Sequence, residues 1–171
     1  MPGPFLSDGI FIGPVTSVDT TQQNELGIMR WDASRILQYV KFNSYVTPND
    51  WVQLDIPVGA VGGTLTNAAA ANAFNYQVID LQGNPTYCPW GVWEGPTIAL
   101  GNFGWITRLG PATAKVSSTA IAGLDLRPAG VTGVLGAIGT SPTPTVFGGG
   151  FGYLVGPSGN ATGCAVNVRC L

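Results

Sequence analysis

"GNFGWITRLGPATAKV", residues 101–116, decides the fold. Apolar and polar residues alternate along it, so Trp105 and Thr107 share one face of an extended chain and Ile106 lies on the other. Gly110 and Pro111 interrupt this alternation, which then resumes over small residues that allow close sheet packing. The stretch contains no His, Cys, Asp or Glu. It therefore predicts two short strands joined by a turn, with a structural role and no chemistry of its own.

Similar alternation lies on both sides of this stretch. Residues 35–42 put Ile36 and Val40 on one face and Tyr39 on the other, and a Pro-Asn-Asp turn precedes a further strand from residue 51. No stretch has the period of a long amphipathic helix. Many short strands between Gly and Pro turns predict an all-β fold, a small antiparallel β-barrel or sandwich, with residues 26–171 as one domain.

Residues 1–25 have a different pattern. They contain apolar residues without a steady period, interrupted by Pro and Gly. We interpret them as an extended N-terminal arm that cannot bury its own apolar groups, and a first strand laid across the domain is the alternative. An arm of this kind contacts another protein through its apolar side chains. The candidate contact residues are Phe5, Ile10, Phe11 and Ile12.

The composition excludes several classes of function. Hydrophobic residues make up 45% of the chain and charged residues only 9%, so apolar and neutral polar groups must cover much of the surface. That surface suits a protein that binds partners, although a Gly-rich, uncharged barrel has the same composition. The seven basic residues are scattered, which argues against nucleic-acid binding. We expect no membrane span and no signal peptide, because no run of eighteen apolar residues occurs and the N-terminus lacks a basic region.

The residues that carry most enzyme chemistry are scarce. His is absent, which removes the usual general base near neutral pH and the commonest metal ligand. Asp50 and Asp55 lie at the two ends of one predicted strand and do not form a catalytic pair. The three Cys have neither a zinc spacing nor the even count of a disulfide framework. We expect no catalytic residues, no cofactor and no metal, and therefore no enzyme.

The stretch "YCPWGVW", residues 87–93, is the strongest local feature. Its aromatic residues are Tyr87, Trp90 and Trp93. Three interpretations stay open: packing at the end of the barrel, contact with another protein, or a flat platform for a sugar ring. We retain all three residues as candidate protein-contact residues.

Several stretches together resemble the head decoration proteins, or capsid cement proteins, of tailed bacteriophages. "ELGIMRWDASRILQYVKFNSYVTPNDWVQLD" is similar to the opening hairpin and following strand of that family. "GNFGWITRLGPATAKV" is similar to its Gly-Trp-hydrophobic strand, and "AIAGLDLRPAGVTGVL" to the unit after it. "GYLVGPSGNATGCAVNVRCL" resembles the closing strand pair, whereas residues 57–100 depart most from the family pattern.

The resemblance implies a function. It implies a structural virion protein, made in the bacterial host cytoplasm, that binds the outside of the capsid and stabilises the junctions between subunits. Its implied partners are the major capsid protein and further copies of itself in a homotrimer. A carbohydrate-binding or adhesin module of a phage particle is the alternative, and it would use the aromatic residues of 87–93.

Overall fold

The structure, a computed structural model, describes residues 14–55, 76–81, 88–117, 120, 122–123, 125–128, 131–137, 151–156 and 163–170. This part of the chain contains ten strands: β1 (Met29–Asp32), β2 (Arg35–Phe42), β3 (Trp51–Leu54), β4 (Gln77–Asp80), β5 (Pro89–Val92), β6 (Phe103–Ala114), β7 (Leu126–Pro128), β8 (Leu135–Ala137), β9 (Gly152–Leu154) and β10 (Cys164–Arg169). The predicted all-β fold is confirmed. Within the described ranges, no helix is long and apolar enough to cross a membrane.

Five of the strands close into a barrel. β2, β4, β3, β5 and β6 pair in that order, and β2 also pairs with β6. The neighbours are antiparallel except for β2 and β4, which run parallel with Lys41 opposite Gln77. Strand direction alternates around a ring of antiparallel neighbours, so a ring with an odd number of strands needs a parallel pair. The predicted barrel is confirmed, with one parallel pair among its antiparallel ones.

The two faces of β2 contact different apolar clusters. Val40 and Phe42 face the barrel interior, where Phe42 meets Trp93 edge-on with ring centroids 5.0 Å apart. Tyr39 lies on the outer face, in a cluster with Trp105 that Val15 helps to cover. The alternation assigned these residues to the correct faces, and the structure shows that side chains on both faces are removed from water.

Residues 14–25, which precede β1, lie along the outer cluster of Tyr39 and Trp105. Asp19 forms a β-bridge with Phe103, and its Oδ2 accepts a hydrogen bond of 2.8 Å from the Tyr39 hydroxyl. Residues 14–25 thus contact the barrel directly. Residues 1–13 lie outside the described part of the chain, and the division of the chain at residue 25 stays a prediction.

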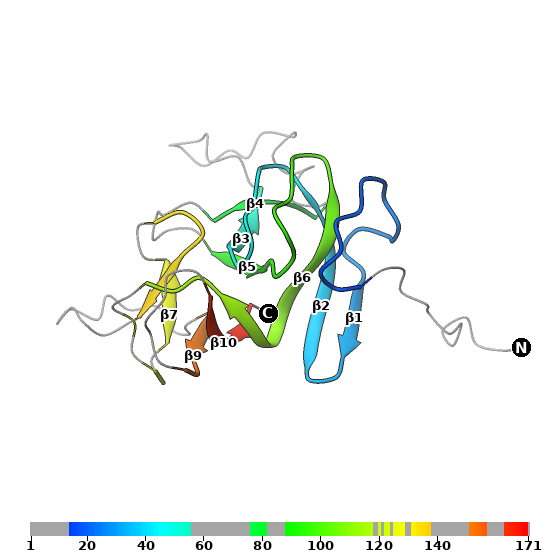
Figure 1. The fold of residues 1–171 in the computed structure, drawn as a ribbon. Coiled ribbons are helices and arrows are strands. Elements are labelled where there is room, and N and C mark those ends of the chain that lie inside the picture. Colours follow the sequence, from blue (N-terminus) through cyan, green and yellow to red (C-terminus); the bar gives the residue numbers. More distant parts are fainter. Residues whose placement is uncertain are drawn as a thin grey trace, which may run out of the picture.

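The predicted turn at Gly110–Pro111 is a bend within one continuous strand. β6 runs through these residues without a break, first beside β2 and then beside β10 (Figure 1). Gly110 has a φ of +98°, which an L side chain rarely adopts. A Cβ at Gly110 would also lie 2.3 Å from the carbonyl oxygen of Ser34 in the β1–β2 turn. The Gly-Pro pair was correctly located but does not end the strand, because both halves of β6 have pairing partners.

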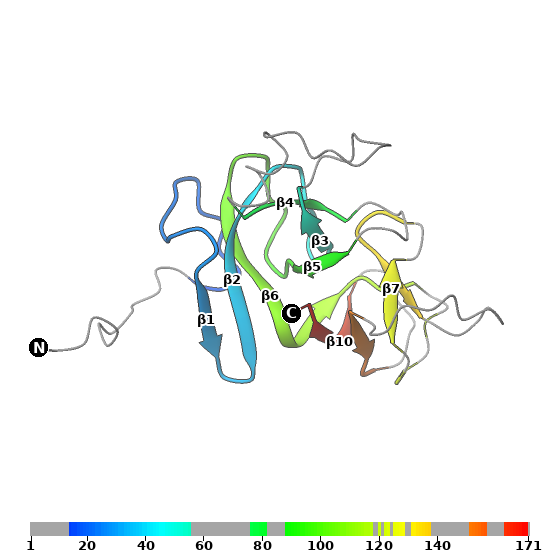
Figure 2. The same ribbon diagram turned by 180° about the vertical axis from the view of Figure 1, so that it is seen from behind.

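The bend creates a second core on the far side of the barrel wall. The β1–β2 hairpin lies at one end of the molecule and β7 at the other (Figure 2), and β10 lies between β6 and β9 in the sheet. β3 separates the two cores, since Trp51 packs in the second core while Val52 faces the barrel interior. The indole Nε1 of Trp51 donates a 3.0 Å hydrogen bond to the carbonyl oxygen of Lys115. Both faces of β3 are therefore buried, and this strand joins the two cores.

The Gly110 bend generates the first prediction. Gly110→Ala should lower the free energy of unfolding by about 3 kcal/mol or more, because both the positive φ and the contact with Ser34 oppose a methyl group. Gly101→Ala is the matched control, since Gly101 has a φ of +88° but no atom within 4 Å of a Cβ. The control should cost only about 1–2 kcal/mol in urea unfolding. Equal losses in the two variants would contradict a steric role for the Ser34 contact.

Candidate functional site

The structure describes two of the predicted contact residues. The other five lie outside the described residues: Phe5, Ile10, Phe11, Ile12 and Tyr87. Trp93 has none of its side chain exposed and packs in the barrel core, with its Nε1 donating a 2.7 Å hydrogen bond to the carbonyl oxygen of Pro96. Of the three interpretations, packing in the barrel describes Trp93. The Trp93 side chain is therefore not available at the surface for contact with a sugar or another protein.

Trp90 is half-buried at the end of the same interior. Its Nε1 donates a 2.9 Å hydrogen bond to Oε1 of Gln38, and the guanidinium of Arg108 lies 3.6 Å from the centroid of its ring. Arg108 is itself buried and donates to Gln38 Oε1 at 2.5 Å and to the carbonyl oxygen of Cys170 at 2.7 Å. Burial lowers the pKa of Arg108 to about 10, so the side chain stays charged at neutral pH. This face of Trp90 is occupied by a cation and is not open to a sugar ring.

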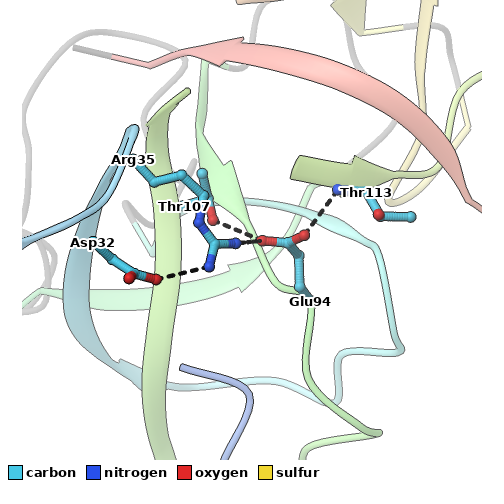
Figure 3. Close-up of polar contacts among 5 residues, drawn as sticks. All are labelled: Asp32, Arg35, Glu94, Thr107 and Thr113. Carbon is cyan, nitrogen blue, oxygen red and sulfur yellow. Dashed lines mark hydrogen bonds and ion pairs between the residues drawn. The ribbon is translucent and has the colours of Figure 1, made fainter. Parts of the chain in front are cut away.

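A cluster of charged and polar groups fastens the β1–β2 hairpin to β6 on both sides of the bend (Figure 3). Glu94 Oε2 accepts hydrogen bonds from Arg35 Nη1 at 3.0 Å and Thr107 Oγ1 at 2.9 Å. Its Oε1 accepts a 2.8 Å bond from the backbone N–H of Thr113, which lies beyond the bend. Arg35 Nη2 also pairs with Asp32 at 2.8 Å. One carboxylate therefore joins the β1–β2 hairpin to both halves of β6.

The contacts of this cluster join separate strands of the fold. Both oxygens of Glu94 accept hydrogen bonds, and the guanidinium of Arg35 lies between Glu94 and Asp32 (Figure 3). Across the described ranges, no group of three or more His, Cys, Asp or Glu side chains is placed to hold a metal ion.

A second charged group lies where the barrel meets the second core. Asp50 is buried, with Oδ2 accepting from the Thr47 hydroxyl at 2.6 Å and Oδ1 pairing with Lys115 Nζ at 2.6 Å. A Cβ at Gly133 would lie 2.7 Å from Asp50 Oδ1 and 3.0 Å from Asp80 Oδ1, so the two carboxyl groups converge on this glycine. Burial and then the charge of Asp50 raise the pKa of Asp80 to about 7, against the opposing effect of Lys115.

The outer surface of β1 is the most exposed apolar feature of the hairpin. Trp31 is 75% exposed and Met29 is 48% exposed, and the alternation of the strand puts both on one face. Large aromatic and Met side chains are typical of protein-contact surfaces. Sequence reasoning placed these residues in a strand but gave them no contact role. The signal was present in "MRWD", where apolar and charged residues alternate directly before a tight turn.

No family model matches the sequence, and no curated protein matches it. Among solved structures, the head fiber gp8.5 N base of bacteriophage phi29 is similar with 11% identity, over 78% of this chain and 93% of that chain, at a TM-score of 0.47.

The raised pKa of Asp80 predicts how stability changes with pH. The folded state binds this proton more tightly than the unfolded state, so its contribution is fully present below about pH 4 and is lost as the pH rises through about 7. Asp80→Asn cannot lose a proton and should unfold at a higher temperature than the wild type at pH 8. The gain should be about 1–2 kcal/mol, because partial solvent contact reduces the value that the full shift implies.

The measurement is thermal unfolding of both proteins from pH 4 to pH 8. The difference between the two melting temperatures should shrink toward zero as the pH falls to about 4. Asp50→Asn is the control and should be destabilised, because it weakens the ion pair with Lys115. Parallel curves for the wild type and Asp80→Asn across this range would contradict the assignment.

The Glu94 cluster gives a prediction about stability. Glu94→Ala should lower the free energy of unfolding by about 2–3 kcal/mol, because it leaves the partly buried guanidinium of Arg35 without this acceptor and also removes the acceptor of the exposed Thr113 N–H. Asp32→Ala, which removes the more exposed partner of Arg35, should cost less than about 1 kcal/mol. Denaturant unfolding of dilute protein measures both, and a larger loss for Asp32→Ala would refute the central role of Glu94.

Proposed function

We propose that this chain is a structural protein of a tailed-bacteriophage particle that binds the outside of the capsid shell and stabilises the junctions between subunits. Support comes from the ordered resemblance of four stretches to the decoration and cement proteins, which covers roughly residues 26–171. A decoration protein has to present a stable surface to a repeating lattice, and a small β-barrel with a filled interior suits that role.

The observation that carries the proposal is the exposure of large apolar side chains on a chain with few charges. Charged residues make up only 9% of the sequence. Seven large hydrophobic residues are nonetheless exposed by 36% or more within the described part of the chain: Ile28, Met29, Trp31, Tyr45, Leu100, Val131 and Val155. Burying such side chains against a partner removes apolar area from water and favours association.

The proposed mechanism is binding without catalysis. The partner is the major capsid protein, and the chain acts on the capsid surface of the virion as the homotrimer that the resemblance implies. A protein that binds the assembled lattice and not the free subunits stabilises the lattice by mass action. Many copies add their contributions, so each single contact can be modest. The arm residues Phe5 and Ile10–Ile12 are proposed to add contacts to this lattice.

Among the described residues, the aromatic side chains of 87–93 do not form a flat platform for a sugar ring. The alternative depended on a flat surface made by Tyr87, Trp90 and Trp93. Trp93 is buried in the core, and one face of Trp90 is covered by Arg108. We therefore retain capsid binding as the proposed function and treat glycan binding as an outcome that its test must separate.

The test uses purified shells of the parent phage that lack this protein. We expect the added chain to sediment with expanded shells in a saturable ratio, to leave unassembled capsid protein in the supernatant, and to raise the temperature at which shells rupture. Shells with their full complement of the protein are the matched control and should bind no more. Binding to host polysaccharide with no binding to shells would overturn the proposal in favour of a glycan module.

A truncation tests the proposed contribution of the arm. Removing residues 1–13 leaves the described contacts of residues 14–25 in place, so the melting temperature should change little. Affinity for shells should fall by about tenfold or more, because apolar contacts worth at least about 1.4 kcal/mol are lost. Unchanged shell affinity in a folded variant would remove the arm from the proposed interface.

A further inference from the structure

We propose that the free edge of β1 pairs with the same edge of a second copy of this chain, in an antiparallel ladder around a two-fold axis at Trp31. The proposal does not depend on the capsid role. A two-fold contact joins copies in pairs, so it is separate from any three-fold contact.

β1 is an edge strand of the described sheet. It lies at the end of the strand order and pairs only with β2, with Arg30 opposite Leu37. The pairing begins at a bulge, where Gly27 N–H donates to the carbonyl oxygen of Tyr39 and Tyr39 N–H donates to that of Ile28. Hydrogen-bonded and non-hydrogen-bonded pairs alternate along an antiparallel ladder. Counted from the bonds at Tyr39, the backbone of Arg30 is hydrogen-bonded to β2, and the backbone N–H and C=O of Trp31 point away from β2. Trp31 thus presents its N–H and C=O groups to an incoming strand.

Along β1, apolar side chains on one face alternate with charged side chains on the other. Met29 and Trp31 are exposed on one face, whereas Arg30 and Asp32 lie on the other. On that second face, the guanidinium of Arg30 lies 4.5 Å from the centroid of the Trp105 ring, and Asp32 is held by Arg35. Both charged side chains are therefore positioned along the strand by contacts within their own chain.

This alternation is self-complementary in one register. With Trp31 opposite Trp31 of the partner subunit, the two residues exchange both backbone hydrogen bonds and their indole rings lie side by side. Arg30 then faces the partner's Asp32, and Asp32 faces the partner's Arg30, in non-hydrogen-bonded positions where side chains approach closely. A shift by two residues places either Arg30 opposite Arg30 of the partner subunit or Asp32 opposite the partner's Asp32. Like charges disfavour both shifted registers.

The charge pattern is the reason to assign this edge to a second copy and not to another protein. One two-fold axis satisfies both ion pairs with the same two residues, as an isologous interface requires. The turn beyond Asp32 consists of Ala33 and Ser34, whose small side chains allow a close approach. Two paired strands of four residues bury much less surface area than a stable protein–protein interface does. The association is therefore expected at high local concentration, as on a particle surface.

The test uses two charge reversals, Arg30→Asp and Asp32→Arg, in the full chain. Each alone puts like charges opposite each other in the paired edges and should raise the dissociation constant of the β1 contact at least tenfold. Mixed in equal amounts, the two variants put opposite charges at both positions and should associate to within about threefold of the wild type. Sedimentation velocity from about 10 μM to about 1 mM, the range in which small interfaces dissociate, measures this.

Two further variants separate this contact from effects on folding. Trp31→Ser changes a 75% exposed side chain, so it should keep the melting temperature and lose association. Tyr45→Ser changes a side chain that is 64% exposed outside β1 and should keep both. A mixture of the two charge variants that associates no better than either alone would overturn the proposal. So would a wild type that shows no concentration dependence while Trp31→Ser loses shell binding, since the edge would then serve the capsid.

Discussion

The close approach of the β1–β2 turn to Gly110 is the constraint on which the rest of the architecture depends. The Ser34 carbonyl oxygen lies where even a methyl group at position 110 would clash, and the φ of +98° suits glycine alone. That single position lets β6 change direction while it stays hydrogen-bonded. One strand can then form part of the barrel wall with its first half and part of the second core with its other half. Glu94 fixes the angle by holding Arg35, Thr107 and Thr113 together.

The sequence predicted features that depend on neighbours in the chain. Alternation along residues 35–42 located β2 and its two faces, and the Gly-Pro pair marked the position of the bend. It did not show that β6 continues, because that depends on β10, whose residues begin at Cys164, fifty positions beyond the end of β6. The sequence also did not predict the parallel pairing of β2 with β4, because that pairing follows from the number of strands that close the barrel.

The candidate site was predicted in part. The aromatic stretch at 87–93 was recognised, but periodicity alone could not tell a buried Trp93 from an exposed one, because burial is set by the strands that surround it. Trp90 could not be matched with Arg108, which is far from it in sequence and covers its ring in the fold. The exposed Trp31 lay in a recognised strand. Its exposure follows from the edge position of β1, which is a property of the sheet order and not of the strand itself.

The arrangement of charges separates the parts of the molecule that hold the fold from the part that can meet a partner. Glu94, Asp50 and Arg108 each have short hydrogen bonds or ion pairs within the chain; Asp50 and Arg108 are buried and Glu94 is partly buried. Burying charges in pairs costs desolvation, but it specifies which strands come together. The β1 edge differs because its apolar face and backbone groups are exposed beside charges of both signs. Natural sheets keep such edges short or charged to prevent indiscriminate pairing. A four-residue edge with alternating charges limits pairing to strands that match it, and this makes β1 selective.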